Sequence, residues 1–156
     1  GSSPQNASYE YLMLVKPNSK EESKYSKKLP YSVLQADDAA HVVNDEITGI
    51  TAYISYKGYA SDKILLAEAE AETIVMERTK ADGSVVMSIC TPDLGITQKG
   101  YTTTQPSQEI VKKVVLNGNW TLSDPCDAVK MTSDGNKTII EVSCVHGQPV
   151  EISLKS

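Results

Sequence analysis

The chain lacks phenylalanine altogether and has a single tryptophan, Trp120, so aromatic packing falls mainly to its eight tyrosines. Its interior must therefore be built mostly from Val, Ile, Leu, Met and Tyr side chains. No apolar run approaches the roughly 20 residues that a helix needs to cross a bilayer, so we expect no membrane partner. A length of 156 residues suits one domain or two small packed sheets.

Positive charge is also scarce, because 15 Lys and Arg face 20 Asp and Glu and leave a formal net charge of −5. Polyanions are bound through clustered positive charge, so we expect no nucleic-acid partner and no main binding site for a sulfated sugar chain. The lysine-rich segment 16–28 is a local exception. Lys20, Lys24 and Lys27 fall at i, i+4 and i+7 and would share one helix face. We regard them as candidates for guiding an anionic sugar chain, with a solvated face as the alternative.

Cysteine is limited to Cys90, Cys126 and Cys144, and an odd number cannot be fully paired within one chain. We favour three unpaired thiols, with a Cys126–Cys144 disulfide as the alternative. No Cys/His cluster has zinc spacing. The carboxylates of the acidic run 68–72 are a possible calcium set, but they are more typical of a solvated or charge-protected strand. We therefore expect no metal and no cofactor.

The N-terminal part has strong local signals. Residues 9–15 are rich in strand-forming side chains and predict a strand. Ser19 and Glu22 have the spacing of a capping box, which predicts a helix over about residues 20–28 that Pro30 ends.

Short β-rich segments bounded by turn residues fill the rest of the chain, at 31–35, 40–43, 47–56, 64–68, 73–79, 84–90, 109–116, 119–122, 129–132, 138–145 and 150–154. The pairs Asp82-Gly83 and Asn117-Gly118 are hairpin signals, and residues 133–136 form another. High helix propensity leaves a helix as the alternative for residues 64–77. The pattern predicts an all-β fold, an antiparallel β-sandwich with one short N-terminal helix.

Aromatic side chains are the candidates for carbohydrate binding, because sugar rings stack on them. We select Trp120, Tyr59 and Tyr101, while noting that a chain without phenylalanine also needs its Trp and Tyr for the core. Neither His41 nor His146 lies in a recognisable nucleophile or triad pattern, so both are expected to be structural.

The N-terminal pattern resembles a known junction. A Tyr-x-Tyr strand at Tyr9 and Tyr11, a turn at Pro17, a short helix with Tyr25 and a Pro-led strand at 30–34 are similar to the boundary before the C-terminal β-domain of family-eight polysaccharide lyases, the chondroitin and hyaluronan lyases. The resemblance extends more loosely through segments 49–53 and 83–93.

This resemblance implies a parent enzyme that cleaves uronic-acid-containing glycosaminoglycans by β-elimination. The family's catalytic Asn, His, Tyr and Arg match no position here, so we expect no catalytic residue in this chain and no activity of the chain alone. Its implied role is that of a non-catalytic C-terminal β-sandwich, packed on and supporting catalytic domains that lie upstream in the same polypeptide. The glycosaminoglycan substrate is then the parent enzyme's partner, and a periplasmic or secreted location is implied.

The expected organisation is a cloning remnant or flexible lead at 1–8, the end of an upstream central β-domain at 9–45, and the C-terminal β-sandwich at 46–156. A function of a different class is an independent carbohydrate-binding or adhesin-like module. An exposed aromatic row that includes Trp120 would favour this alternative, whereas an exposed apolar patch around residues 9–15 would favour the lyase domain.

Overall fold

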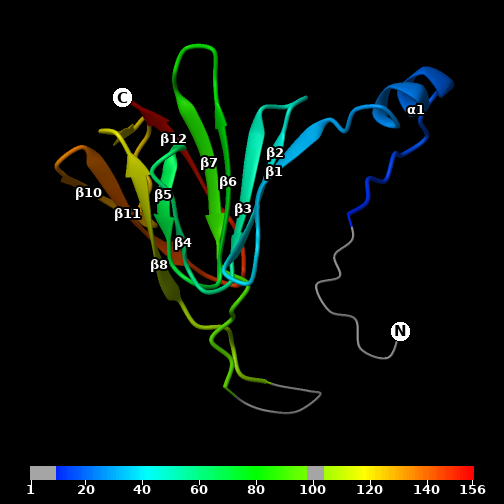
Figure 1. Cartoon of the computed structure of the whole chain (residues 1–156). Coiled ribbons are helices and arrows are strands. Elements are labelled where there is room, and N and C mark those ends of the chain that lie inside the picture. Colours follow the sequence, from blue (N-terminus) through cyan, green and yellow to red (C-terminus); the bar gives the residue numbers. More distant parts are fainter. Residues whose placement is uncertain (1–9, 98–103) are drawn as a thin grey trace. The chain divides into compact units, whose positions relative to one another are not determined.

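The computed structural model describes residues 10–97 and 104–156 (Figure 1). The backbone contacts divide the chain into two compact units, Gly1–Pro30 and Tyr31–Ser156. Within the described residues, no helix has both the length and the apolar character needed to span a membrane.

The first unit contains helix α1, Ser19–Tyr25. Its N-cap is Asn18, whose side chain accepts hydrogen bonds from the backbone of Lys20 and Glu21 at 3.0 Å each, while Glu21 Oε2 accepts from the Asn18 backbone at 2.9 Å. The capping box predicted for Ser19 and Glu22 therefore exists one residue earlier. Asparagine is as good an N-cap as serine, so either residue could begin the helix and the local sequence does not decide between them.

The strand predicted for residues 9–15 is wrong over the residues that the structure describes. Residues 10–14 form neither helix nor strand, and a bend follows at Val15. The side chains of Tyr11, Met13 and Val15 are 74%, 76% and 85% exposed. Strand propensity alone does not form a strand, because the backbone N–H and C=O groups also need a neighbouring strand to pair with.

The described residues of the second unit form twelve antiparallel strands, which confirms the predicted all-β class. Their bounds are β1 Tyr31–Ala36, β2 Ala40–Asp45, β3 Ile50–Ser55, β4 Tyr59–Ala60, β5 Leu66–Ala69, β6 Thr73–Thr79, β7 Val85–Cys90, β8 Ile110–Asn117, β9 Thr121–Leu122, β10 Val129–Asp134, β11 Lys137–Cys144 and β12 Val150–Lys155. One sheet has seven strands in the order β1-β2-β3-β6-β7-β12-β9, and the other has five in the order β10-β11-β8-β5-β4.

The core lies between the two sheets and follows the period of two that strands impose. On β7 the inward Val85, Met87 and Ile89 are fully buried and alternate with partly exposed residues. The five-stranded sheet contributes Leu116 and Ile140 from the opposite side. Ser55 on β3 reaches across to the five-stranded sheet and donates to the backbone carbonyl of Ala69 at 3.5 Å.

Two of the three hairpin predictions are confirmed. The Asp82-Gly83 turn joins β6 to β7, with Gly83 at φ +82° and the Lys80 N–H donating to the Ser84 carbonyl at 2.8 Å. The turn over residues 133–136 joins β10 to β11.

The Asn117-Gly118 hairpin is wrong, because the flanking strands do not pair. β8 pairs with β11 and β5 in one sheet, whereas β9 pairs with β12 in the other. Gly118 does adopt the positive φ that the signal requires, +94°. It uses that conformation to carry the chain from one sheet to the other.

Residues 66–69 form strand β5 and not a helix. The inward positions of this segment are Leu66, Ala67 and Ala69, which are at most 5% exposed, so burial against the facing sheet overrides helix propensity. The two-residue strand β4 pairs with β5.

The predicted boundary near residue 45 falls inside a sheet, because β2 and β3 pair on either side of it. β1 and β2 thus belong to the sandwich, and the two compact units divide at Pro30. Assignment of the segment before Tyr31 to an upstream domain stays a prediction.

Candidate functional site

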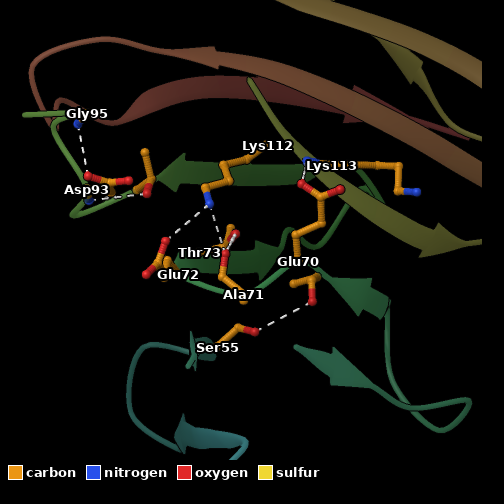
Figure 2. A network of polar contacts seen from close by, with 11 residues as sticks. Ser55, Glu70, Ala71, Glu72, Thr73, Asp93, Gly95, Lys112 and Lys113 are labelled. Atoms are coloured by element: carbon orange, nitrogen blue, oxygen red, sulfur yellow. Dashed lines mark hydrogen bonds and ion pairs between the residues drawn. The ribbon is translucent and has the colours of Figure 1, made fainter. Parts of the chain in front are cut away.

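The acidic run of 68–72 meets Lys112 and Lys113 of β8 (Figure 2). Lys112 Nζ donates to the Ala71 carbonyl at 3.0 Å and lies 3.9 Å from Glu72 Oε2. Glu70 Oε2 accepts from the Lys113 backbone N–H at 3.0 Å. The Lys112 side chain is only 11% exposed, so its charge is held mostly by these protein oxygens.

The third carboxylate of the run, Glu68, forms an ion pair with Lys137 at 3.0 Å. The three acids therefore have three separate partners. Glu72 has a positive φ of 56°, and its carboxylate lies 3.9 Å from the Lys112 ammonium. Over the described ranges, no three His, Cys, Asp or Glu side chains are grouped so that they could hold a metal ion. The network fastens the β5–β6 connection onto β8.

The loop after β7 is ordered by side-chain contacts at its start. The Asp93 N–H donates to Thr91 Oγ1 at 3.3 Å, and Asp93 Oδ1 accepts from the Gly95 N–H at 2.9 Å (Figure 2). At the other end of the loop, Ser107 Oγ is hydrogen-bonded to His146 Nδ1 in the turn between β11 and β12.

The Ser107–His146 pair joins a hydroxyl to an imidazole, and no local motif predicts this contact because 39 residues separate its members. A nucleophilic triad also needs a carboxylate that orients the imidazole. Among the described residues, the hydrogen-bond partner of His146 is Ser107, and the exposed side chain and positive φ of 59° of this histidine fit a turn. We regard the pair as a tie between the loop and the sandwich.

A buried acid lies inside the sandwich at the inner face of β6. Glu77 is 8% exposed, and Tyr53 on β3 donates its hydroxyl to Glu77 Oε1 at 2.5 Å. In the described residues no group hydrogen-bonds to Glu77 Oε2. Tyr59 on β4 packs edge-on against Tyr53, with the ring centroids 5.4 Å apart. This cluster went unpredicted, since a glutamate in a strand gives no sign of which face it occupies.

Burial is the main cause of the pKa shifts in this cluster. It raises the pKa of Glu77 above the ordinary 4.5, against the opposing effect of the Tyr53 hydrogen bond. The pKa of Tyr53 is raised by burial and by the neighbouring Glu77. Burial also raises the pKa of Tyr59 and of the free thiols of Cys90 and Cys144.

The aromatic candidates for carbohydrate binding have different surroundings. Tyr59 is 5% exposed and packed in the core, a position in which it cannot stack on a sugar ring. Tyr101 lies outside the described residues. Trp120 is partly buried, and its indole N–H donates to the Asn117 carbonyl at 2.8 Å. It lines a groove of about 290 Å³ together with Leu122 and Met131 and the hydroxyl side chains of Thr121, Thr132, Ser133 and Thr138.

The lysine candidates are exposed, and all three lie in the first unit. Lys20 and Lys24 belong to α1, whereas Lys27 lies beyond its last residue, so the helix holds two of the three. The Lys24 ammonium lies 5.1 Å from the centre of the Tyr25 ring.

Comparison with known proteins gives the chain its relatives. It is 26% identical over 156 residues to the chondroitin sulfate ABC endolyase of Proteus vulgaris, an alignment that covers 97% of the chain. It is also 26% identical over 176 residues to the chondroitin sulfate ABC exolyase of Bacteroides thetaiotaomicron, which covers 99%. The chain is homologous to chondroitin sulfate ABC lyases. No family model matches it.

The homologous region is a small part of each relative, because the chain spans 15% of the endolyase and 17% of the exolyase. The fold has neighbours among solved lyases. Two X-ray structures of the chondroitin AC lyase of Streptomyces coelicolor A3, one of them in complex with chondroitin sulphate, superpose with TM-scores of 0.64 and 0.63 at 13% identity. They cover 88% and 89% of this chain and 17% of the lyase chain.

Proposed function

We propose that the chain is a non-catalytic C-terminal β-sandwich domain of a larger glycosaminoglycan lyase that cleaves chondroitin sulfate by β-elimination. The observation that carries this proposal is the alignment, which runs through nearly the whole chain yet spans only 15–17% of its lyase relatives. In these relatives a region of this size is one part of a much longer polypeptide.

The exposed apolar segment before α1 supports the same function. Tyr11, Met13 and Val15 are more than 70% exposed, although such side chains are normally buried in a soluble domain. A partner surface from the rest of the lyase would cover them. The domain would then pack on the catalytic domains and support them, with its own acids and lysines engaged in structural contacts.

The test is an assay of the 156-residue chain on chondroitin sulfate, with the absorbance of the unsaturated uronate product as the readout and calorimetry for glycan binding. We expect neither turnover nor binding. Turnover by this chain alone would show that it carries a catalytic set and would overturn its non-catalytic role.

One observation favours a second function, carbohydrate binding. The groove beside Trp120 combines an aromatic ring with four hydroxyl side chains, the chemistry that recognises a sugar. In that case the chain would bind chondroitin oligosaccharides in the calorimeter without cleaving them. Trp120→Ala would abolish the binding. Tyr56→Ala, at an exposed tyrosine that directly follows β3, would leave it unchanged.

A further inference from the structure

The two outer faces of the sandwich have different compositions. An outer sheet face that meets water normally carries polar and charged side chains, with the apolar ones turned inward. Directly paired residues on neighbouring antiparallel strands lie on the same face, so the strand register identifies the members of each outer face.

The outer face of the five-stranded sheet carries charged rows beside apolar positions such as the 55% exposed Val111. Lys130, Glu141 and Lys113 form one row across β10, β11 and β8, and all three are exposed. Lys137, two rows away, pairs with Glu68 at 3.0 Å. Alternating charges of this kind favour contact with water.

The outer face of the seven-stranded sheet is different at β3, β6 and β7, which lie side by side in Figure 1. Two successive rows carry no charge, Ile54-Ile74-Cys90 and Ala52-Met76-Ser88, and the next row is Ile50-Arg78-Val86. We call these nine residues the β3–β6–β7 face. Met76 and Ile54 are 44% and 39% exposed, so large apolar side chains lie open at its middle.

A hollow lies in this face. Its volume is about 270 Å³, and Ile50, Met76, Val86 and Ser88 line it together with the ionisable residues Glu77, Arg78 and Glu151. Arg78 is the only arginine of the chain and is exposed. Among the described residues it takes part in none of the ion pairs, which all involve lysines.

We propose that the β3–β6–β7 face packs against another domain of the longer lyase polypeptide, one that inserts apolar side chains into the hollow and places a carboxylate opposite Arg78. This inference rests on the proposed function. Protein interfaces are enriched in methionine and arginine and have an apolar centre. Arginine binds carboxylates with a bidentate geometry. Most of each relative's length lies outside the matched region and can supply such a domain.

Methionine oxidation tests the proposal directly, because trypsin places Met76 alone in the peptide 64–78. Hydrogen peroxide converts exposed methionines to sulfoxides much faster than buried ones. In the 156-residue chain we expect Met76 to be oxidised readily and the fully buried Met87 to be protected. In the longer lyase polypeptide Met76 should become as protected as Met87. Equal oxidation of Met76 in both proteins would overturn the proposal.

Substitutions separate this interface from a structural role. Met76→Lys should leave the melting temperature of the 156-residue chain unchanged and lower that of the longer polypeptide. Val111→Lys is the matched control, because Val111 is 55% exposed on the outer face of the five-stranded sheet, and it should affect neither protein. If the two variants lowered the melting temperature of the longer polypeptide equally, the face would have no special partner.

Other occupants of the face would be recognised in the same samples. Sedimentation of the isolated chain as a dimer that Met76→Lys dissociates would assign the face to a second copy and overturn the proposal. Protection of Met76 in the isolated monomer would assign it to the chain's own N-terminal segment, with the same consequence. The longer polypeptide is also assayed for turnover: protection without turnover contradicts the proposed function alone, whereas turnover without protection contradicts only the interface.

Discussion

Glu77 gives the sharpest prediction of stability against pH. Its carboxyl group is 8% exposed, one oxygen accepts from Tyr53, and the other has no hydrogen-bond partner in the described residues. Burial therefore holds its folded-state pKa above the ordinary 4.5. The native state binds this proton more tightly than the unfolded state, so the stability that it contributes is complete below pH 4.5 and is lost as the pH rises through the folded pKa.

The expected size follows from proton linkage. One group released only on unfolding changes the free energy of unfolding by about 1.4 kcal/mol per pH unit across that window. Glu77→Gln keeps the acceptor for the Tyr53 hydroxyl but cannot ionise. The variant should therefore lose this slope, and its stability relative to wild type should increase with pH above 4.5.

Urea unfolding from pH 4 to pH 8 measures the effect. The pKa values of Asp37, Asp45 and Asp82 are lowered by hydrogen bonds, so their contributions are gained as the pH rises through 3.8 and are nearly complete above about pH 5, where the slopes are compared. The exposed Glu109→Gln serves as the control and should follow the wild-type slope. Parallel curves for wild type and Glu77→Gln would refute the raised pKa of Glu77.

Three further substitutions test other contacts. Lys112→Met should destabilise the sandwich by about 1–3 kcal/mol, because the Ala71 carbonyl loses its charged donor, and a chemical denaturation curve would show it. Gly118→Ala should lower the melting temperature, because a Cβ would lie 3.1 Å from the Trp120 indole nitrogen and Gly118 has a φ of +94°. An unchanged melting temperature would mean that the backbone between β8 and β9 adapts freely. Asn18→Ala should cost α1 about 1 kcal/mol and reduce its helical circular dichroism, unless Ser19 takes over as the cap.

The sequence predicts a strand correctly where the turn residues and the alternation of buried and exposed side chains agree. The Asp82-Gly83 turn lies between strands that alternate in burial, so turn chemistry and register point to the same hairpin. Asn117-Gly118 shows the limit of such signals. The turn requires the same positive φ, but which strand lies beside β9 is decided by long-range pairing with β12.

The candidate site was less accessible to sequence reasoning. A tyrosine suited to sugar stacking and a tyrosine suited to the core look alike in sequence, and Tyr59 proved to be a core residue. The Ser107–His146 contact and the Tyr53–Glu77 pair join residues far apart in the chain, so only the fold brings them together. The apolar character of the β3–β6–β7 face likewise emerges only once three strands are placed in register.

The most direct test of the central claim compares chondroitin sulfate cleavage by the longer polypeptide and by the 156-residue chain, with both followed by the absorbance of the unsaturated uronate product. The account predicts turnover by the longer polypeptide and none by the chain alone. Turnover by the isolated chain, or none by the longer polypeptide, would contradict it.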